Sequence, residues 1–237
     1  AKDWTIDEQK AAATDIAKNG TSSVVYAKAK AAMDASTTWS VKLTNGKTMS
    51  YRIIGINHDD IADGSGKAGL TFLTSTTSVG SQYSSGLTSA RMNETDTNAG
   101  GWEKSELRGR LNSGDLWALL PSNFQSKVKA VTKLTNNAGG TDANAAVTAT
   151  ADKLFLLSRS EIVETPYSSW SSYPWVSSEG TQYEAYKDTG RTGLVSWVWT
   201  RSAQPGNKYS FVCSGYGSFN TGDGGSCENP AYAAFAF

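Results

Sequence analysis

The stretch 39-WSVKLTNGKTMSYRII-54 decides the fold class of this chain. Apolar and polar residues alternate on both sides of the pair Asn45-Gly46. Alternation with a period of two is typical of a half-buried β-strand, and Asn-Gly is the preferred pair for a two-residue type I′ turn because both residues tolerate positive φ. The stretch therefore predicts an antiparallel β-hairpin with one face turned towards the core.

The segment before the hairpin has a different character. Residues 5–33 are rich in Ala and Lys, which favour helix, and Asn19-Gly20 supplies a stop signal between two short helices. The apolar stripe of these helices is thin, so we expect them to pack on the main body or on another subunit. We divide the chain into an N-terminal helical extension, residues 1–36, and a ligand-binding domain, residues 37–237.

Short elements and long loops follow the hairpin. Strands are predicted at 68–73, 153–157, 194–200, 209–214 and 231–237, the last with Phe235 and Phe237 on one face. Helices are predicted at 102–111, with Trp102, Leu107 and Leu111 inward, at 122–131 and at 158–162, the last two opened by the capping boxes Ser122/Gln125 and Ser158/Glu161. Loops are predicted at 74–98, 135–150 and 166–191. This pattern indicates an α+β fold.

Composition and charge exclude several classes of protein. The 22 basic and 22 acidic residues give a net charge of zero, which argues against nucleic-acid binding. No apolar run approaches the roughly 20 residues of a membrane span, so we expect no membrane insertion. The first residues are charged and show no N-terminal signal. The expected location is a virion or the bacterial cell surface, and the cytoplasm if neither applies.

Recognisable catalytic and metal-binding motifs are missing from the sequence. His58 is the only histidine, no serine lies in a nucleophile elbow, and turn hydrogen bonds are the expected role of His58. Asp59, Asp60 and Asp63 offer hard oxygens but fail the spacing of a calcium loop, so a metal there is left open and an Asp-rich turn is expected. The glycines at 64–66 and 222–225 are predicted to form tight turns. We therefore expect no catalytic residue, no cofactor and no metal.

The C-terminal segment carries the clearest functional signal. Residues 203–229 contain three charged residues, while tyrosines and phenylalanines are interleaved with Ser, Gly and Asn. Antibody paratopes use this composition, because rigid rings supply contact area and small polar residues supply adaptable hydrogen bonds. It predicts a ligand-binding surface. The alternative is an ordinary β-rich surface with its rings inward, and we assign Phe211 to the core for that reason.

Eight residues are predicted to contact the ligand, with the aromatic rings as anchors. They are Lys208, Tyr209, Tyr216, Ser218, Phe219, Asn220, Asp223 and Asn229. Trp197, Trp199 and Arg201 are predicted to form the base beneath them. Because the rings should be exposed, replacing Tyr209, Tyr216 and Phe219 together by serine is expected to leave the thermal midpoint nearly unchanged.

Seven segments together resemble the landmarks of a bacterial and phage domain family of unknown function that has a C-type-lectin-like fold. In chain order they are 57-NHDD-60, 66-GKAGLTF-72, 98-NAGGWEKSELR-108, 120-LPS-122, 152-DKLFLLS-158, 179-EGTQYE-184 and 199-WTRS-202. The resemblance implies two helices that flank a small twisted antiparallel sheet with long loops.

The chain is also similar to the variable proteins of diversity-generating retroelements, in which a C-terminal segment on this fold is diversified. Arg201-Ser202 matches the start of that segment. The similarity implies a non-enzymatic receptor-recognition protein of a phage or bacterium, whose partner is a protein or glycan on a cell surface.

Two alternatives remain open at this point. Formylglycine-generating enzymes share this kind of fold and oxidise cysteine with a cysteine pair, which Cys213 and Cys227 could supply. A structural phage tail component could use the N-terminal helices for assembly. The sequence leaves open the oligomeric state and whether the two cysteines form a disulfide.

Overall fold

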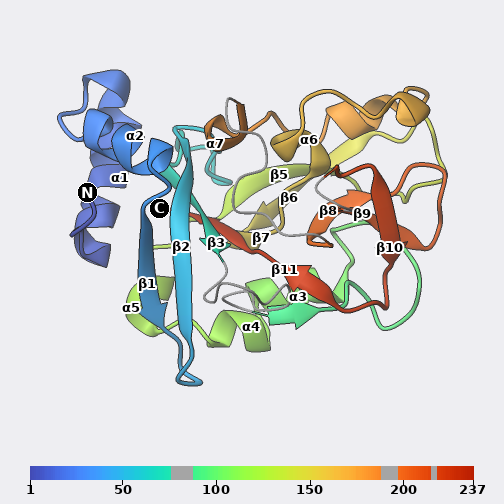
Figure 1. Ribbon diagram of the computed structural model, residues 1–237, viewed down its shortest axis with the longest axis horizontal. Coiled ribbons are helices and arrows are strands. Elements are labelled where there is room, and N and C mark those ends of the chain that lie inside the picture. The colour runs from blue at the N-terminus through green and yellow to red at the C-terminus, as the bar shows by residue number, and fades with distance from the viewer. Residues whose placement is uncertain (76–87, 188–196, 215–217) are drawn as a thin grey trace.

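Antiparallel sheets organise the part of the chain that the computed structural model describes, namely residues 1–75, 88–187, 197–214 and 218–237 (Figure 1). The largest sheet has five strands in the order β1-β2-β3-β12-β7. Smaller sheets in the same residues contain β10-β9-β8, β11-β4 and β5-β6. The fold is therefore mixed α+β, as predicted.

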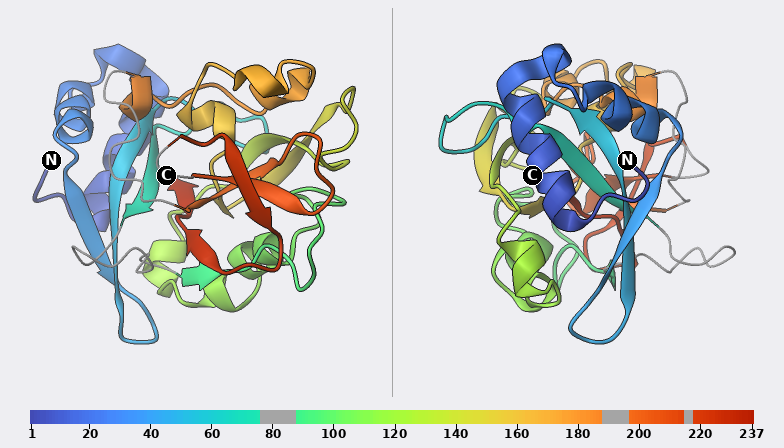
Figure 2. Two further views of the ribbon diagram at one scale, coloured as in Figure 1. Left: turned by 45° about the vertical axis from the view of Figure 1, so that its right-hand side comes forward. Right: turned by 90° about the vertical axis from the view of Figure 1, so that its left-hand side faces the viewer.

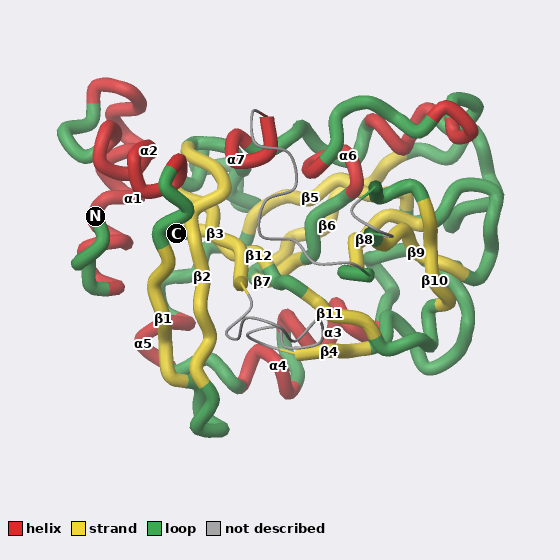
Figure 3. Tube along the Cα trace, viewed as in Figure 1, coloured by secondary structure: helices red, strands yellow, loops and turns green. Residues whose placement is uncertain are grey.

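The helices are short outside the N-terminal region, and loops separate many of the elements (Figure 3). The α-helices are α1 (Ile6–Asn19), α2 (Tyr26–Asp34), α3 (Glu106–Asn112), α4 (Asp115–Ala118), α5 (Ser122–Gln125), α6 (Arg159–Ile162) and α7 (Glu184–Lys187), and 3₁₀ turns lie at Gly20–Ser22, Ser168–Trp170 and Pro174–Ser177. The strands are β1 (Thr38–Lys42), β2 (Thr48–Ile56), β3 (Leu70–Ser75), β4 (Thr88–Ala90), β5 (Val131–Asn136), β6 (Val147–Asp152), β7 (Leu154–Phe155), β8 (Trp199–Ala203), β9 (Ser210–Cys213), β10 (Thr221–Gly224), β11 (Asn229–Ala231) and β12 (Ala234–Ala236).

The predicted hairpin is confirmed, but its turn differs. β1 pairs with β2 over all five of its residues. Of the pair Asn45-Gly46, only Gly46 has a positive φ, 83°, and its N–H donates to the carbonyl of Leu43 over 3.0 Å. The Leu43 N–H donates to the carbonyl of Lys47 over 2.8 Å, so the turn itself consists of the three residues 44–46, and Gly46 is the left-handed one. The predicted type I′ turn is wrong, because that turn requires positive φ at both central residues.

Both predicted N-terminal helices are present and pack on the body of the protein. A capping box between Thr5 and Glu8 begins α1, and Gly20 ends it with a φ of 55°. Ile16 is fully buried in the main core. Helix α1 lies so close to the sheet that a Cβ on Gly69 would be 1.8 Å from the carbonyl oxygen of Ala13.

The helix predicted at 122–131 is wrong in extent. Helix α5 ends at Gln125, and Val131 already belongs to β5. The Ser122/Gln125 capping box does not form, because Pro121 is the N-cap residue and Ser122 is already the first residue of the helix. The Gln125 Nε2 donates to the carbonyl of Trp117 over 2.9 Å. By contrast, the Ser158/Glu161 box is present and opens α6. The two sequences differ in that Ser158 is the N-cap residue of its helix and Ser122 is not.

The loop predicted at 135–150 is also wrong at its ends, because β5 and β6 form an antiparallel hairpin there. Its inward positions include Lys133, Thr135 and Asp152, all buried. Because the inner face of this hairpin is polar, its strands lack the apolar alternation from which a strand is predicted. The helix predicted at 102–111 begins later, at Glu106, but Trp102, Leu107 and Leu111 are fully buried as expected.

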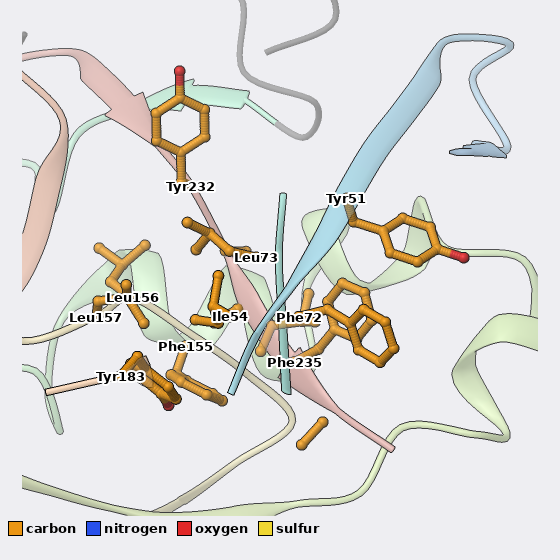
Figure 4. Close-up of a cluster of buried hydrophobic side chains, with 14 of the residues drawn as sticks. Tyr51, Ile54, Phe72, Leu73, Phe155, Leu156, Leu157, Tyr183, Tyr232 and Phe235 are labelled. Carbon is orange, nitrogen blue, oxygen red and sulfur yellow. The ribbon is translucent and has the colours of Figure 1, made fainter. Parts of the chain in front are cut away.

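Aromatic rings fill the core around the last strand. Phe235 on β12 stacks with Phe72 on β3 at 5.3 Å between ring centroids, and Tyr51 on β2 meets it edge-on at 5.3 Å. Figure 4 shows these rings on one side of the strands and Phe155 on the other. The strand predicted at 231–237 is split into β11 and β12, which enter different sheets. Phe235 and Phe237 are both buried.

Candidate ligand-binding surface

Five charged side chains from distant parts of the chain meet inside the protein. We call them the ion cluster: Asp59, Lys133, Glu161, Glu179 and Arg201, each at most 4% exposed. Lys133 Nζ donates to Asp59 Oδ1 over 2.7 Å and lies 2.5 Å from Glu161 Oε1. Arg201 binds both oxygens of Glu161, at 2.5 and 3.1 Å. The cluster joins β8 to β5, to α6 and to the loop after β2.

Arg201 also uses its remaining donors on neighbouring chain segments. Its Nε donates to Thr135 Oγ1 over 2.9 Å, its Nη1 to the carbonyl of Leu156 over 2.8 Å, and its Nη2 to the carbonyl of Glu179 over 2.7 Å. Such a planar, multidentate guanidinium fixes the groups around it. Strand β8, which begins the C-terminal region, is therefore held firmly against the body.

The carboxyl groups of the ion cluster differ in their electrostatic situation. Burial alone would raise the pKa of Glu161, but the charges of Arg201 and Lys133 outweigh it and hold this pKa below its usual value. Burial raises the pKa of Glu179 to about 7, although Ser202 and the Asn136 N–H donate to it. Two cations thus compensate two carboxylates, and Glu179 carries the surplus titratable charge.

Glu179 should make stability depend on pH. Its folded pKa of about 7 lies above the value of 4.5 for an unperturbed glutamate, so the folded state binds the extra proton between these values. Its stabilising contribution is complete below pH 4.5 and is lost as pH rises through 7, by at most about 3 kcal/mol. Chemical denaturation of Glu179→Gln should show a gap from the wild type that changes with pH.

Between pH 5 and pH 8, the free energy of unfolding of Glu179→Gln should increase relative to that of the wild type. The matched control is Glu103→Gln, which removes an exposed carboxyl and should keep the pH profile of the wild type. A constant difference between Glu179→Gln and the wild type over this range would contradict the assignment.

The segments that carry the family resemblance converge on the ion cluster. Asp59, Glu179 and Arg201 come from three of them, and Ser158 from a fourth donates to the carbonyl of Glu179 over 2.8 Å. Lys133 and Glu161 lie in none of these segments, and sequence reasoning missed the ionic role of both. The one available signal was a lysine at an inward position between Val131 and Thr135 of a short strand. The landmarks therefore mark the buried support of the C-terminal region.

The predicted contact residues Lys208 and Tyr209 lie on the loop between β8 and β9 and are exposed, Tyr209 by 49%. The Lys208 ammonium lies 5.0 Å from the centroid of the Tyr209 ring. Asn98 fixes the loop, because its Nδ2 donates to the carbonyls of Asn207 and Ser210 over 2.7 and 2.8 Å. The two exposed side chains project from a well-anchored backbone.

Three further predicted contacts, Ser218, Asn220 and Asp223, are half-buried near or on β10. Ser218 Oγ lies 2.5 Å from Asn220 Oδ1. The sequence prediction of tight turns at 222–225 missed β10, which pairs with β9 at the edge of its sheet. Strand β10 lies at the end of the molecule opposite the N-terminal helices α1 and α2 (Figure 1).

Other predicted contacts are placed differently. Phe219 is 0% exposed and belongs to the main core, so its prediction as an exposed ring is wrong. Its backbone has a φ of 44°, and its carbonyl accepts from Arg159 Nε over 2.8 Å. Asn229 is buried and donates to Asp223 Oδ2 over 3.0 Å. Tyr216 lies outside the described residues.

The three residues predicted to form the base differ in burial. Trp199 is 2% exposed, and its indole N–H donates to the carbonyl of Ala90 over 2.7 Å. Arg201 is fully buried in the ion cluster, while Trp197 is half-buried. We define the C-terminal surface as Lys208, Tyr209, Ser218, Asn220 and Asp223, the predicted contacts that retain exposure.

The two cysteines are unpaired in the structure. Cys213 is fully buried on β9, and burial raises its pKa to about 12. Burial and a hydrogen bond to Asp223 raise the pKa of Cys227 to about 11. Reactive cysteines need a lowered pKa, because the thiolate is the nucleophile and the metal ligand. Neither thiol has the environment of an activated cysteine.

The three aspartates considered for a metal turn to different partners. Asp59 binds Lys133 and Tyr183, Asp60 binds Lys67 at 2.8 Å, and Asp63 accepts from the N–H of Ser65 over 2.8 Å. Within the described residues, no group of three or more His, Cys, Asp or Glu side chains is arranged to hold a metal ion.

The environment of His58 differs from the predicted turn. Its Nδ1 lies 3.2 Å from Glu184 Oε1, and its ring stacks on Tyr183 with centroids 4.0 Å apart. These partners are distant in sequence, so the expectation of local turn hydrogen bonds is wrong. His58 and Asp59, with Lys67 and Thr181, line an open pocket of about 300 Å³ over the ion cluster.

Comparison with known proteins places this chain in a family. No helix in the described ranges has both the length and the apolar character that a membrane crossing requires. No curated protein and no solved structure matches the chain. Residues 68–228 match a family described as a domain of unknown function. This match covers more than half of the chain, including four members of the ion cluster, and the protein belongs to that family, DUF6273.

Proposed function

We propose that this protein is a non-enzymatic ligand-binding protein that recognises its partner through the C-terminal surface. The observation that carries the proposal is the pairing of Lys208 with the exposed ring of Tyr209 on an anchored loop. Tyrosine is enriched at binding hot spots, and the neighbouring ammonium group adds positive charge beside the contact area of the ring.

Anchoring of the loop supports recognition energetically. Tyr209 N–H and Ser210 N–H both donate to Asn207 Oδ1, over 2.7 and 3.0 Å, and the Gly206 N–H donates to the carbonyl of Gly140 over 2.8 Å. A loop held in this way loses little conformational entropy when a ligand binds. The ion cluster serves the same purpose, since it fixes the adjacent strand β8.

The chemistry of the surface suits a polar partner with some apolar area. Asp223 adds a carboxylate, and Ser218 and Asn220 add a hydroxyl and an amide. We propose a protein or glycan on a cell surface as the partner, and a virion or bacterial surface as the place of action. A C-type-lectin-like fold, similar to the variable proteins of diversity-generating retroelements, would present its variable segment here.

Oxidoreductase chemistry of the formylglycine-generating type is less well supported. That chemistry requires a thiolate, and the pKa values of both Cys213 and Cys227 are raised. The proposal of a structural tail component rests on the N-terminal helices as a surface for assembly. Ile16 of these helices is buried in the core of this same chain, so its side chain is not free to contact another subunit.

The test uses bacterial cells and a glycan array with the full chain. If either gives a binding signal for the wild type, Lys208→Ala and Tyr209→Ser should each weaken binding at least tenfold with little change in thermal midpoint. Matched controls are Lys153→Ala, which removes a lysine lying 4.6 Å over the ring of Trp117, and Val24→Ser, which alters an 88% exposed residue.

The two controls should bind as the wild type does. Unchanged affinity in both Lys208→Ala and Tyr209→Ser would overturn the assignment of the surface. Absence of any wild-type binding to either probe would contradict a cell-surface protein or glycan as partner.

A further inference from the structure

A lysine-lined pocket lies at the other end of the molecule, against α1. It has a volume of about 200 Å³, and its lining includes Lys10, Lys67, Lys129, Thr14, Ile61 and Phe237. Three separate parts of the chain supply the lysines: α1, the loop before β3, and the segment between α5 and β5. We call this the lysine pocket.

The backbone around the lysine pocket is held in place. The Lys129 N–H donates to the carbonyl of Ala236 over 2.8 Å, and the Ala62 N–H donates to the carbonyl of Ala130 over 2.9 Å. Lys10 lies on the well-capped helix α1. The gathering of like charges is therefore built into the fold.

Compensation of these charges is incomplete. Lys67 pairs with Asp60 at 2.8 Å, and the neighbouring Lys127 pairs with Asp7 at 2.7 Å. Within the described part of the chain, Lys10 and Lys129 form no ion pair.

Asp63 is another acidic group near this site. It feels the charge of Lys129, but its carboxylate is exposed and engaged with Ser65. The pocket thus retains positive charge at Lys10 and Lys129.

Lys10 shows the consequence of this arrangement. It is half-buried, and burial, followed by the charges of Lys129 and Lys127, lowers its pKa to about 8. Like charges that are brought together in a partly desolvated site repel one another. A bound anion would remove that repulsion and would bring the pKa of Lys10 back up.

We infer that the lysine pocket binds a phosphate or sulfate group between Lys10 and Lys129, with Lys67 as a third cationic neighbour. Lysine ammonium groups bind such oxyanions as compact point charges. The pocket, at about 200 Å³, is large enough to admit one such group. The ligand is a free anion or the terminal group of an ester.

The site is independent of the proposed ligand-binding function. Helix α1 and strand β10 lie at opposite ends of the molecule (Figures 1 and 2). Variants in one place can therefore be tested without altering the other, and either proposal can fail alone.

The experiment measures thermal unfolding and calorimetric binding at pH 7 in potassium phosphate against potassium chloride of equal ionic strength. Phosphate should raise the midpoint of the wild type, and chloride should not. Lys10→Gln and Lys129→Gln should each weaken phosphate binding at least tenfold. Lys153→Gln, which removes a lysine elsewhere on the surface, should bind as the wild type does.

Additional arms identify the source of the group. Sulfate binding as tight as phosphate binding supports a site for free oxyanions, whereas tighter binding of glycerol 1-phosphate supports a phosphate ester. The Lys10 pKa, followed by NMR, should rise when phosphate is added. Equal wild-type midpoints in phosphate and chloride with no calorimetric binding, or wild-type affinity in both Lys10→Gln and Lys129→Gln, would overturn the inference.

Discussion

Replacing Arg201 with methionine is expected to lower the free energy of unfolding by about 3–5 kcal/mol, because it breaks a buried ion pair from one side. Glu161 would lose its bidentate partner, and the carbonyls of Leu156 and Glu179 would lose a donor. None of these groups can turn to water, since the guanidinium they surround is fully buried. Urea denaturation at pH 7 gives the measurement.

A surface ion pair provides the matched control. Arg91 lies 3.3 Å from Glu106, and both side chains are about 40% exposed, so Arg91→Met should cost less than about 1 kcal/mol. Should Arg201→Met fail to fold, Arg201→Lys keeps the charge without the planar fork and should be destabilised by an intermediate amount. A loss below 1 kcal/mol for Arg201→Met would show that the ion cluster does not hold β8 in place.

Replacing Phe219 with alanine is expected to cost about 3–5 kcal/mol, the usual penalty for emptying a packed phenylalanine site. The ring is fully buried, although its neighbours in sequence are Ser and Asn. Tyr209→Ala, on the exposed loop of the same region, should change stability by less than about 0.5 kcal/mol. The two variants together separate core from surface within one Gly- and Ser-rich segment.

This pair corrects the expectation that serine at 209, 216 and 219 together would leave the thermal midpoint unchanged. The triple variant should now unfold at a lower temperature than the wild type. Of the two described positions, 209 and 219, the loss of the Phe219 ring should cause the lower midpoint. If Phe219→Ala costs no more than Tyr209→Ala, the ring is not a core residue and its prediction as a ligand contact would stand again.

Local signals predicted the elements that depend on near neighbours. The β1–β2 hairpin follows from alternation around Asn45-Gly46, the end of α1 from Gly20, and the start of α6 from the Ser158/Glu161 capping box. In each case the deciding contacts join residues a few positions apart, so sequence order brings the partners together.

Elements that depend on distant partners were not predictable in this way. The sequence of strand β5 predicts the end of a helix and the start of a loop, because its inward residues are Lys133 and Thr135. A polar inner face of this kind is stable only where buried partners pair with its polar groups. Strand β10, with the sequence TGDG, has no apolar alternation and owes its form to pairing with β9.

The candidate site shows the same division. Composition singled out residues 203–229, and within them Lys208 and Tyr209 are exposed while Phe219 is buried. Tyr209 and Phe219 are both aromatic residues within one Gly- and Ser-rich segment, and composition alone does not assign one to the surface and the other to the core. In the structure Phe219 has a positive φ and its ring belongs to the main core.

Amino-acid order alone was enough for the α+β class, the hairpin and the N-terminal helices, because short-range turn, cap and period rules govern them. Tertiary packing decided which charges meet in the ion cluster, which C-terminal rings face outward, and where Lys10 and Lys129 come together. Electrostatic and packing energies act through space between residues far apart in the chain, so these arrangements exist only once the chain has closed on itself.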